Sequence, residues 1–212
     1  MLNKIENQET GLLPSGPDFF KKRMKKLDSI SKNILSTLLI LFIFQSFLFV
    51  IIQVAAKIPL SSAIFYYPVS FGFHLFLLYG LFRLKNYFFL VSTGEPLKKI
   101  NLANIITLVR MSAIPSIFFL LIFVRFPGIK WVLIVYISFV FITDFVDGIL
   151  ARSMNQITGI GKYIDSSGDY MILFFSSIGY LYSSLIPLWL FIMIVIRIFS
   201  IGVTAIVLYF IK

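Results

Sequence analysis

Four aspartates in one short stretch are the residues of this chain best suited to chemistry. They are Asp144, Asp147, Asp165 and Asp169, and apolar segments flank the stretch on both sides. Carboxylates beside hydrocarbon are costly unless they are paired or bound to a cation, and four so close together also repel one another. All-oxygen ligand sets suit hard divalent cations such as Mg2+ or Mn2+. The chain has no Cys and one His, which argues against a zinc or iron site here.

The spacing of these residues predicts two helices joined by a turn. Residues at i, i+3, i+4 and i+7 share one helix face, and this face holds Asp144, Asp147, Gly148 and Ala151. Asp165 and Asp169 are four residues apart on the next helix. With a short turn at about 152–161, two antiparallel helices would bring all four carboxylates to one membrane surface. The alternative is that the carboxylates only cap two helices at an interface.

Composition predicts an all-α, polytopic membrane bundle. Of the 212 residues, 59% are hydrophobic and 17% are aromatic. The net charge of +10 is interpreted as topology bias and attraction to anionic lipids, and no nucleic-acid partner is expected. Six apolar segments are long enough to cross about 30 Å of hydrocarbon. We place them near 34–56, 64–84, 103–124, 130–151, 164–183 and 186–210.

The distribution of Lys and Arg predicts the orientation. Fourteen of the 19 basic residues fall on the side of the two termini and the acidic turn, three fall on the other side, and two lie within spans. This split places the N-terminus, the C-terminus and the acidic turn in the cytoplasm. Segment 1–33 has a basic cluster at 21–26 and is expected to form a juxtamembrane amphipathic helix on anionic lipid. Its alternative role is a plain topology signal.

Polar residues in the third and last spans could reach the same site. Asn104, Thr107 and Arg110 follow one another at steps of three residues, beginning at the surface of the acidic turn. An unpaired Arg at that depth is costly, so Arg110 should face the bundle interior and meet an anion. Arg197 in the last span should also point inward.

These residues carry a family resemblance. The pattern D-x-x-D-G-x-x-A-R-x(8)-G-x-x-x-D-x-x-x-D, from Asp144 to Asp169, resembles the signature of the CDP-alcohol phosphotransferases at every fixed position. The motif Asn104-x-x-Thr107-x-x-Arg110 is similar to the first core helix of the phosphatidylglycerophosphate synthase branch. The resemblance covers 98–212, which becomes the expected core domain, preceded by a basic segment 1–33 and an accessory two-helix hairpin 34–97. Family members usually have six core spans and four follow here, so either the chain is a fragment or the early helices replace the missing ones.

The resemblance implies a reaction and roles for the residues. A CDP-linked lipid or alcohol would give its phosphatidyl or phospho-alcohol group to an acceptor hydroxyl, releasing CMP. Two divalent cations, Mg2+ or Mn2+, would be held by Asp144, Asp147 and Asp165, with Asp169 near a metal and acting as general base. The residues expected to line the nucleotide pocket are Gly148, Ala151, Arg152, Gly161, Asn104 and Thr107. Arg110 and Arg197 are candidates for an acceptor phosphate.

The resemblance also implies a homodimer in the cytoplasmic membrane that makes a phospholipid. Glycerol 3-phosphate is the favoured acceptor, with inositol phosphate, serine or a second lipid as alternatives. Two readings from other classes remain: an ion-coupled transporter with intramembrane carboxylates, and a truncated, catalytically silent scaffold. A transporter predicts carboxylates near the midplane of the bilayer, whereas these cluster at a turn.

Overall fold

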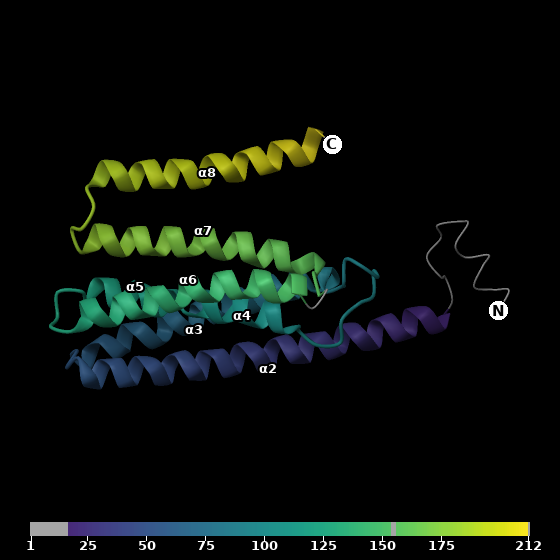
Figure 1. Ribbon diagram of the computed structural model, residues 1–212, viewed down its shortest axis with the longest axis horizontal. Coiled ribbons are helices and arrows are strands. Elements are labelled where there is room, and N and C mark those ends of the chain that lie inside the picture. The colour runs from purple at the N-terminus through teal and green to yellow at the C-terminus, as the bar shows by residue number, and fades with distance from the viewer. Residues whose placement is uncertain (1–16, 154–155, 212) are drawn as a thin grey trace.

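The protein is a bundle of helices that lie side by side along one axis (Figure 1). The computed structural model describes the backbone of residues 17–153 and 156–211, and the side chains of residues 28–150, 153 and 156–204. The helices are α2 (Pro17–Ala55), α3 (Ser61–Arg83), the short 3-10 helix η2 (Lys85–Tyr87), α4 (Leu102–Ser112), α5 (Ile114–Ile122), α6 (Ile129–Ser153), α7 (Gly159–Tyr182) and α8 (Leu188–Ile211). Within these residues the only β-type pairing is two isolated bridges. The prediction of an all-α fold is confirmed.

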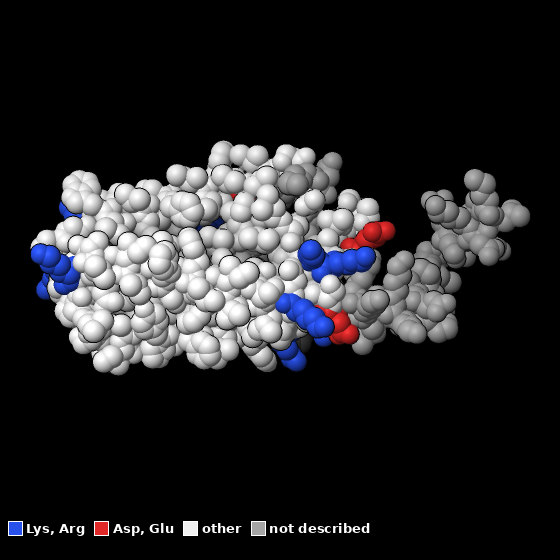
Figure 2. Space-filling view, turned by 90° about the horizontal axis from the view of Figure 1, so that it is seen from below, with Lys and Arg blue, Asp and Glu red and all other residues white. Residues whose placement is uncertain are grey.

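Four stretches of helix are long and apolar enough to cross a membrane, judged by length and composition. They are 28–55 of α2, all of α3, α4 together with α5, and 129–150 of α6. The apolar part of α8 within the described residues is shorter, and α7 carries three charged residues in its first half. In the face shown in Figure 2, basic side chains gather toward the two ends and most of the surface between them is uncharged. The chain is therefore an integral membrane protein, while six spans and a cytoplasmic N-terminus stay predictions.

The first helix is longer than the sequence pattern indicated. We predicted a separate amphipathic helix before residue 34, but α2 runs unbroken from Pro17 to Ala55. Proline is favoured in the first turn of a helix, and no further Pro or Gly interrupts the chain before Ala55. The side chains of the basic cluster at 21–26 lie outside the described residues, so their contact with lipid headgroups stays a prediction.

The third predicted span is two helices that share one axis at the centre of the bundle. Pro115 has no amide hydrogen to donate to the preceding turn, and the helix is interrupted at Ala113, between α4 and α5. The break leaves Arg110 in the last turn of α4, where the helix dipole favours a positive charge. Helix α4 packs on α6 and α7, and α5 packs on α7. The centre of the bundle thus holds the polar stripe that begins at Asn104.

The loop around residues 89–91 contacts the turn between α6 and α7, although this loop lies before the expected core domain at 98–212. Leu90 forms an antiparallel bridge with Thr158, and the Gly159 amide donates to the Phe89 carbonyl at 3.0 Å. A side chain at position 159 would collide with the Phe89 ring, because an added Cβ would lie 2.7 Å from it. Asn101 caps α4 and also donates to the Gln156 carbonyl at 2.7 Å. Residues 156–159, at the end of this turn, are therefore held by both the loop and the start of α4.

The close packing of α5 on α7 depends on Gly179. A Cβ added there would lie 2.8 Å from the Leu121 Cβ, which cannot move without the backbone. We expect Gly179→Ala to lower the free energy of unfolding by about 2 kcal/mol through overpacking. The matched control is Gly80→Ala, because an added Cβ there meets nothing within 4 Å. Thermal unfolding in detergent measures both variants, and equal melting temperatures would contradict this account of the α5–α7 contact.

Candidate metal and nucleotide site

The structure brings the four predicted aspartates together. Helix α6 supplies Asp144 and Asp147, and α7 supplies Asp165 and Asp169 from the facing side. One carboxylate oxygen from each of Asp144, Asp147 and Asp165 lies within 4.8 Å of the others. The antiparallel arrangement expected from the spacing is therefore present, and the carboxylates form one acidic cluster.

Arg110 lies at the centre of the acidic cluster. Its guanidinium contacts Asp144 and Asp165 directly, and Nη1 lies 3.1 Å from Asp169 Oδ1. The Arg110 side chain is 2% exposed, whereas those of Asp144, Asp165 and Asp169 are 45%, 50% and 56% exposed. The expectation that Arg110 faces the interior and meets an anion is confirmed. To hold an acceptor phosphate, as we also predicted, it would have to give up some of these carboxylates.

Asp147 is the buried member of the cluster. It is 7% exposed, and its Oδ2 accepts a hydrogen bond from Thr107 Oγ1 at 2.7 Å. The same hydroxyl lies 3.2 Å from the Ala103 carbonyl one turn earlier in α4. The polar stripe of α4 thus orients this carboxylate.

A polar pocket of about 260 Å3 adjoins the cluster at the turn. It is lined by Ala103, Asn104, Thr107, Asp147, Gly148, Gln156, Ile157, Thr158, Gly161, Lys162 and Asp165. Four residues predicted to contact a nucleotide are among them: Asn104, Thr107, Gly148 and Gly161. The pocket therefore unites the start of α4 with the acidic turn, as the sequence pattern indicated.

Gly161 has a structural role that the sequence did not reveal. Thr158 caps α7 by accepting from the Gly161 amide at 3.1 Å, and it also accepts from Asn104 Nδ2 at 3.0 Å. A Cβ at position 161 would lie 3.0 Å from the Thr158 hydroxyl and 3.2 Å from Asn104 Oδ1. The small residue therefore leaves room for the hydrogen bond between Asn104 and Thr158.

Three predicted site residues are not placed in the pocket. The side chains of Ala151 and Arg152 lie outside the described residues. Arg197 is exposed on α8, so the prediction that it points into the bundle is wrong. The reason is that α8 lies at the edge of the bundle and packs chiefly on α7, so much of its surface meets no other helix (Figure 1).

Several pocket residues were missing from the predicted site. Thr158 and Gln156 fall within the predicted turn at about 152–161, and neither they nor Lys162 were among the predicted site residues. The N-cap pattern of Thr158, three residues before Gly161, was the signal that could have placed its hydroxyl beside α4.

The acidic cluster fits divalent cations. Its four carboxylates carry four negative charges when ionised, and within the described residues only Arg110 forms ion pairs with them. Three charges therefore remain for other cations, and carboxylate oxygens are the ligands that Mg2+ and Mn2+ prefer. Asp144, Asp147 and Asp165 are the three that converge closely enough to share an ion.

Removing Arg110 should expose this charge imbalance. We expect Arg110→Gln, measured without divalent cations, to lose about 3 kcal/mol of stability, because it leaves the carboxylates to repel one another. Mg2+ should then raise the melting temperature of the variant more than that of the wild type. The control is Arg83→Gln, since Arg83 is exposed at the end of α3. An equal response of all three proteins to Mg2+ would argue against a cation site at the cluster.

The fold and site define a helical membrane protein with a candidate metal centre beside a polar pocket. The chain belongs to the CDP-alcohol phosphatidyltransferase family, whose model matches residues 100–212. It is 28% identical to the cardiolipin synthase (CMP-forming) of Streptomyces coelicolor over 101 residues, which are 46% of each chain.

Two further relatives are CDP-diacylglycerol–glycerol-3-phosphate 3-phosphatidyltransferases. The one from Aquifex aeolicus is 31% identical over 84 residues, covering 40% of this chain and 45% of that protein. The one from Bacillus subtilis is 32% identical over 113 residues, covering 48% and 58%. The chain therefore spans about half the length of the curated relatives it matches. No solved structure matches the chain.

Proposed function

We propose that this protein transfers a phosphatidyl group from a CDP-linked diacyl lipid to an acceptor hydroxyl and releases CMP. The observation that carries the proposal is the cluster of four aspartates, three of which pair with Arg110, beside a polar pocket. A nucleotide diphosphate needs cationic partners and room for a flat base, and the two features together offer both. Family membership supports the same reaction.

In the proposed reaction the acceptor oxygen attacks the phosphorus that carries the diacylglycerol. The bond from this phosphorus to the bridging oxygen breaks, and CMP leaves with that oxygen. Divalent cations bound at the cluster would neutralise the diphosphate and stabilise the leaving group. Asp144, Asp147 and Asp165 would hold them, and Thr107 orients the second of these carboxylates.

Asp169 is the proposed general base. It has the most exposed of the three carboxylates that pair with Arg110, and it borders an open cavity between α6 and α7. An acceptor hydroxyl that reached this carboxylate could pass its proton there as the new bond to phosphorus forms. Arg110 Nη1, 3.1 Å from Asp169 Oδ1, orients this carboxylate beside the cavity.

The nucleotide is proposed to occupy the polar pocket. Asn104 and Thr158 offer hydrogen-bonding groups, and Gly148 and Gly161 leave the backbone accessible to a flat ring. Lys162 adds a positive charge at the rim of the pocket. We further propose that this site faces the cytoplasm, where CDP-linked substrates meet the inner leaflet, since most Lys and Arg fall on that side.

Glycerol 3-phosphate is the favoured acceptor, because the relatives from Aquifex aeolicus and Bacillus subtilis are named for it. The Streptomyces coelicolor relative, a cardiolipin synthase, makes a phospholipid acceptor the second candidate. Purified protein incubated with radiolabelled CDP-diacylglycerol, Mg2+ and each acceptor in turn would name the product. We expect CMP release that depends on glycerol 3-phosphate. Release with phosphatidylglycerol alone would favour the second candidate, and no release with any acceptor would contradict the proposed function.

A further inference from the structure

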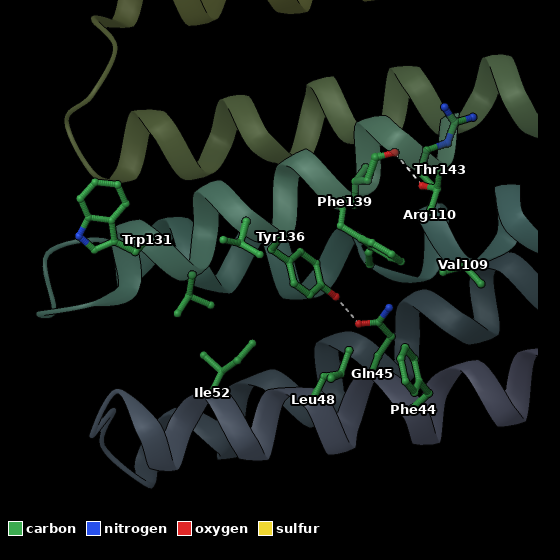
Figure 3. Close-up of a pocket in the computed structure, with 14 residues that line it drawn as sticks. Phe44, Gln45, Leu48, Ile52, Val109, Arg110, Trp131, Tyr136, Phe139 and Thr143 are labelled. Atoms are coloured by element: carbon green, nitrogen blue, oxygen red, sulfur yellow. Dashed lines mark hydrogen bonds between the residues drawn. The ribbon is translucent and has the colours of Figure 1, made fainter. Parts of the chain in front are cut away.

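An apolar cavity of about 550 Å3 lies between α2 and α6, on the side of α6 that faces away from α7 (Figure 3). We call it the α2–α6 groove. Arg110 and Thr143 lie at one end of it, and Ile52 and Trp131 lie at the other. One end therefore adjoins the acidic cluster, while the remainder runs between two candidate membrane spans.

The few polar side chains along the groove are largely satisfied by the protein. Gln45 Oε1 accepts hydrogen bonds from Tyr136 and from Ser116, which ties α2 to α6 through the pair visible in Figure 3. Thr143 Oγ1 donates to the Val140 carbonyl at 2.7 Å. The surface that remains for an occupant is almost wholly apolar, which suits a hydrocarbon chain and little else.

Arg110 lines one end of the groove with the apolar part of its side chain, since its Nε is buried and almost no polar surface faces the groove. Its guanidinium pairs instead with Asp144, Asp165 and Asp169 of the acidic cluster. A lipid whose diphosphate is bound at the acidic cluster can therefore extend a hydrocarbon chain past the carbon atoms of Arg110 into the groove.

The length of the groove also fits such a chain. Thr143 and Trp131 are both on α6, and the 1.5 Å rise per residue puts them about 18 Å apart along the helix. The hydrocarbon of one leaflet is about 15 Å deep. An acyl chain that begins beside Arg110 can therefore lie in the groove along its whole length.

We propose that the α2–α6 groove binds one acyl chain of the CDP-linked lipid whose diphosphate is bound at the acidic cluster. This rests on the proposed function for the identity of the lipid. A second cavity, of about 420 Å3 between α6 and α7, also borders Arg110 and is lined mainly by apolar side chains. Helix α6 thus stands between two apolar cavities, as a lipid with two chains requires. The wall formed by α2 comes from outside the matched family domain, so this helix contributes to lipid selection.

Photolabelling tests the location of the chain without using turnover. The probe is CDP-diacylglycerol with a diazirine near the middle of its acyl chains, added to the protein in phosphatidylcholine nanodiscs. We expect labelled α2 peptides between Phe44 and Ile52, with the label removed by excess unlabelled CDP-diacylglycerol. Labelling of α2 that persists with the competitor would show a bulk lipid in the groove and overturn the proposal. Competed labelling that is missing from α2 would overturn it as well.

Chain-length selectivity tests the same groove by kinetics. Leu48→Trp fills the groove, and we expect it to lower kcat/KM about tenfold for the dipalmitoyl substrate. For the dihexanoyl substrate, whose chains end short of Leu48, the change should stay within about twofold. That retained activity would also show that the variant folds. The matched control is Leu39→Trp, because Leu39 is on the same helix, is 56% exposed and lines none of the described cavities.

The two experiments separate the groove from the reaction. If the wild type turns over its substrate and Leu48→Trp lowers kcat/KM equally for the long-chain and short-chain substrates, the acyl-chain site is overturned. The transferase activity then still stands. No turnover with any CDP-lipid, combined with competed labelling of α2, would contradict the transferase activity and leave the site standing.

Discussion

Asp147→Asn should abolish CMP release from CDP-diacylglycerol. We expect kcat to fall about a thousandfold, which corresponds to about 4 kcal/mol of lost transition-state stabilisation. Asp147 is the buried carboxylate of the cluster, and Thr107 already fixes one of its oxygens. The amide keeps the shape and the hydrogen bond but removes the charge, so the loss would report the electrostatic role of this residue.

The control for this variant is Asp28→Asn, which removes an exposed carboxylate from α2, far along the chain from the site. It should retain the wild-type rate. Both variants are assayed at saturating Mg2+, with radiolabelled lipid and measured release of CMP. Wild-type turnover by Asp147→Asn under these conditions would refute a role in holding metal.

Asp169→Asn should separate binding from chemistry. We expect kcat to fall by about a hundredfold to ten thousandfold, the usual contribution of a general base. Binding of CDP-diacylglycerol, measured by competition with a fluorescent CDP-lipid, should stay close to that of the wild type. The reason is that Asp169 lies outside the set of three carboxylates that converge closely enough to share an ion.

Two other results for Asp169→Asn would contradict the role of this residue as a general base alone. If Asp169→Asn loses lipid affinity as well as turnover, the carboxylate is needed to bind metal or substrate, and a role as base alone is excluded. If turnover is retained, another group takes the proton from the acceptor. A wild-type melting temperature would show that either result is not caused by unfolding, which matters because Asp169 pairs with Arg110.

Helical spacing predicted the acidic cluster well, because residues three or four apart must share a helix face whatever surrounds them. Asp144 with Asp147, and Asp165 with Asp169, needed only a short turn to converge. The same rule placed Asn104, Thr107 and Arg110 on one stripe. Their meeting with the acidic turn followed from the cost of burying polar groups in hydrocarbon.

Contacts between distant segments could not be predicted in this way. The bridge between Leu90 and Thr158, and the Gln45–Tyr136 hydrogen bond, join residues 68 and 91 positions apart without a periodic pattern. The length of α2 was missed because hydropathy changes near residue 34 while the helix continues. Pro115 explains the interruption at Ala113, but the predicted span at 103–124 ran through both residues without a break.

Arg197 shows that the free-energy cost of burying a charge does not by itself predict where a charged side chain points. A charged residue within an apolar helix was expected to face the interior, but an outer helix gives such a side chain another direction. Helix α8 packs chiefly on α7, and Arg197 is exposed. The direction of a buried charge can be inferred only where neighbours surround the helix, as they surround α4.

Direct counting of bound metal tests the central claim. Mn2+ binding is followed by electron paramagnetic resonance on the purified protein in the presence of CDP-diacylglycerol, beside the double variant Asp144→Asn/Asp147→Asn. We predict saturable binding of two Mn2+ ions per chain in the wild type and loss of that binding in the variant. Equal Mn2+ binding by the two proteins would contradict a metal centre at these aspartates.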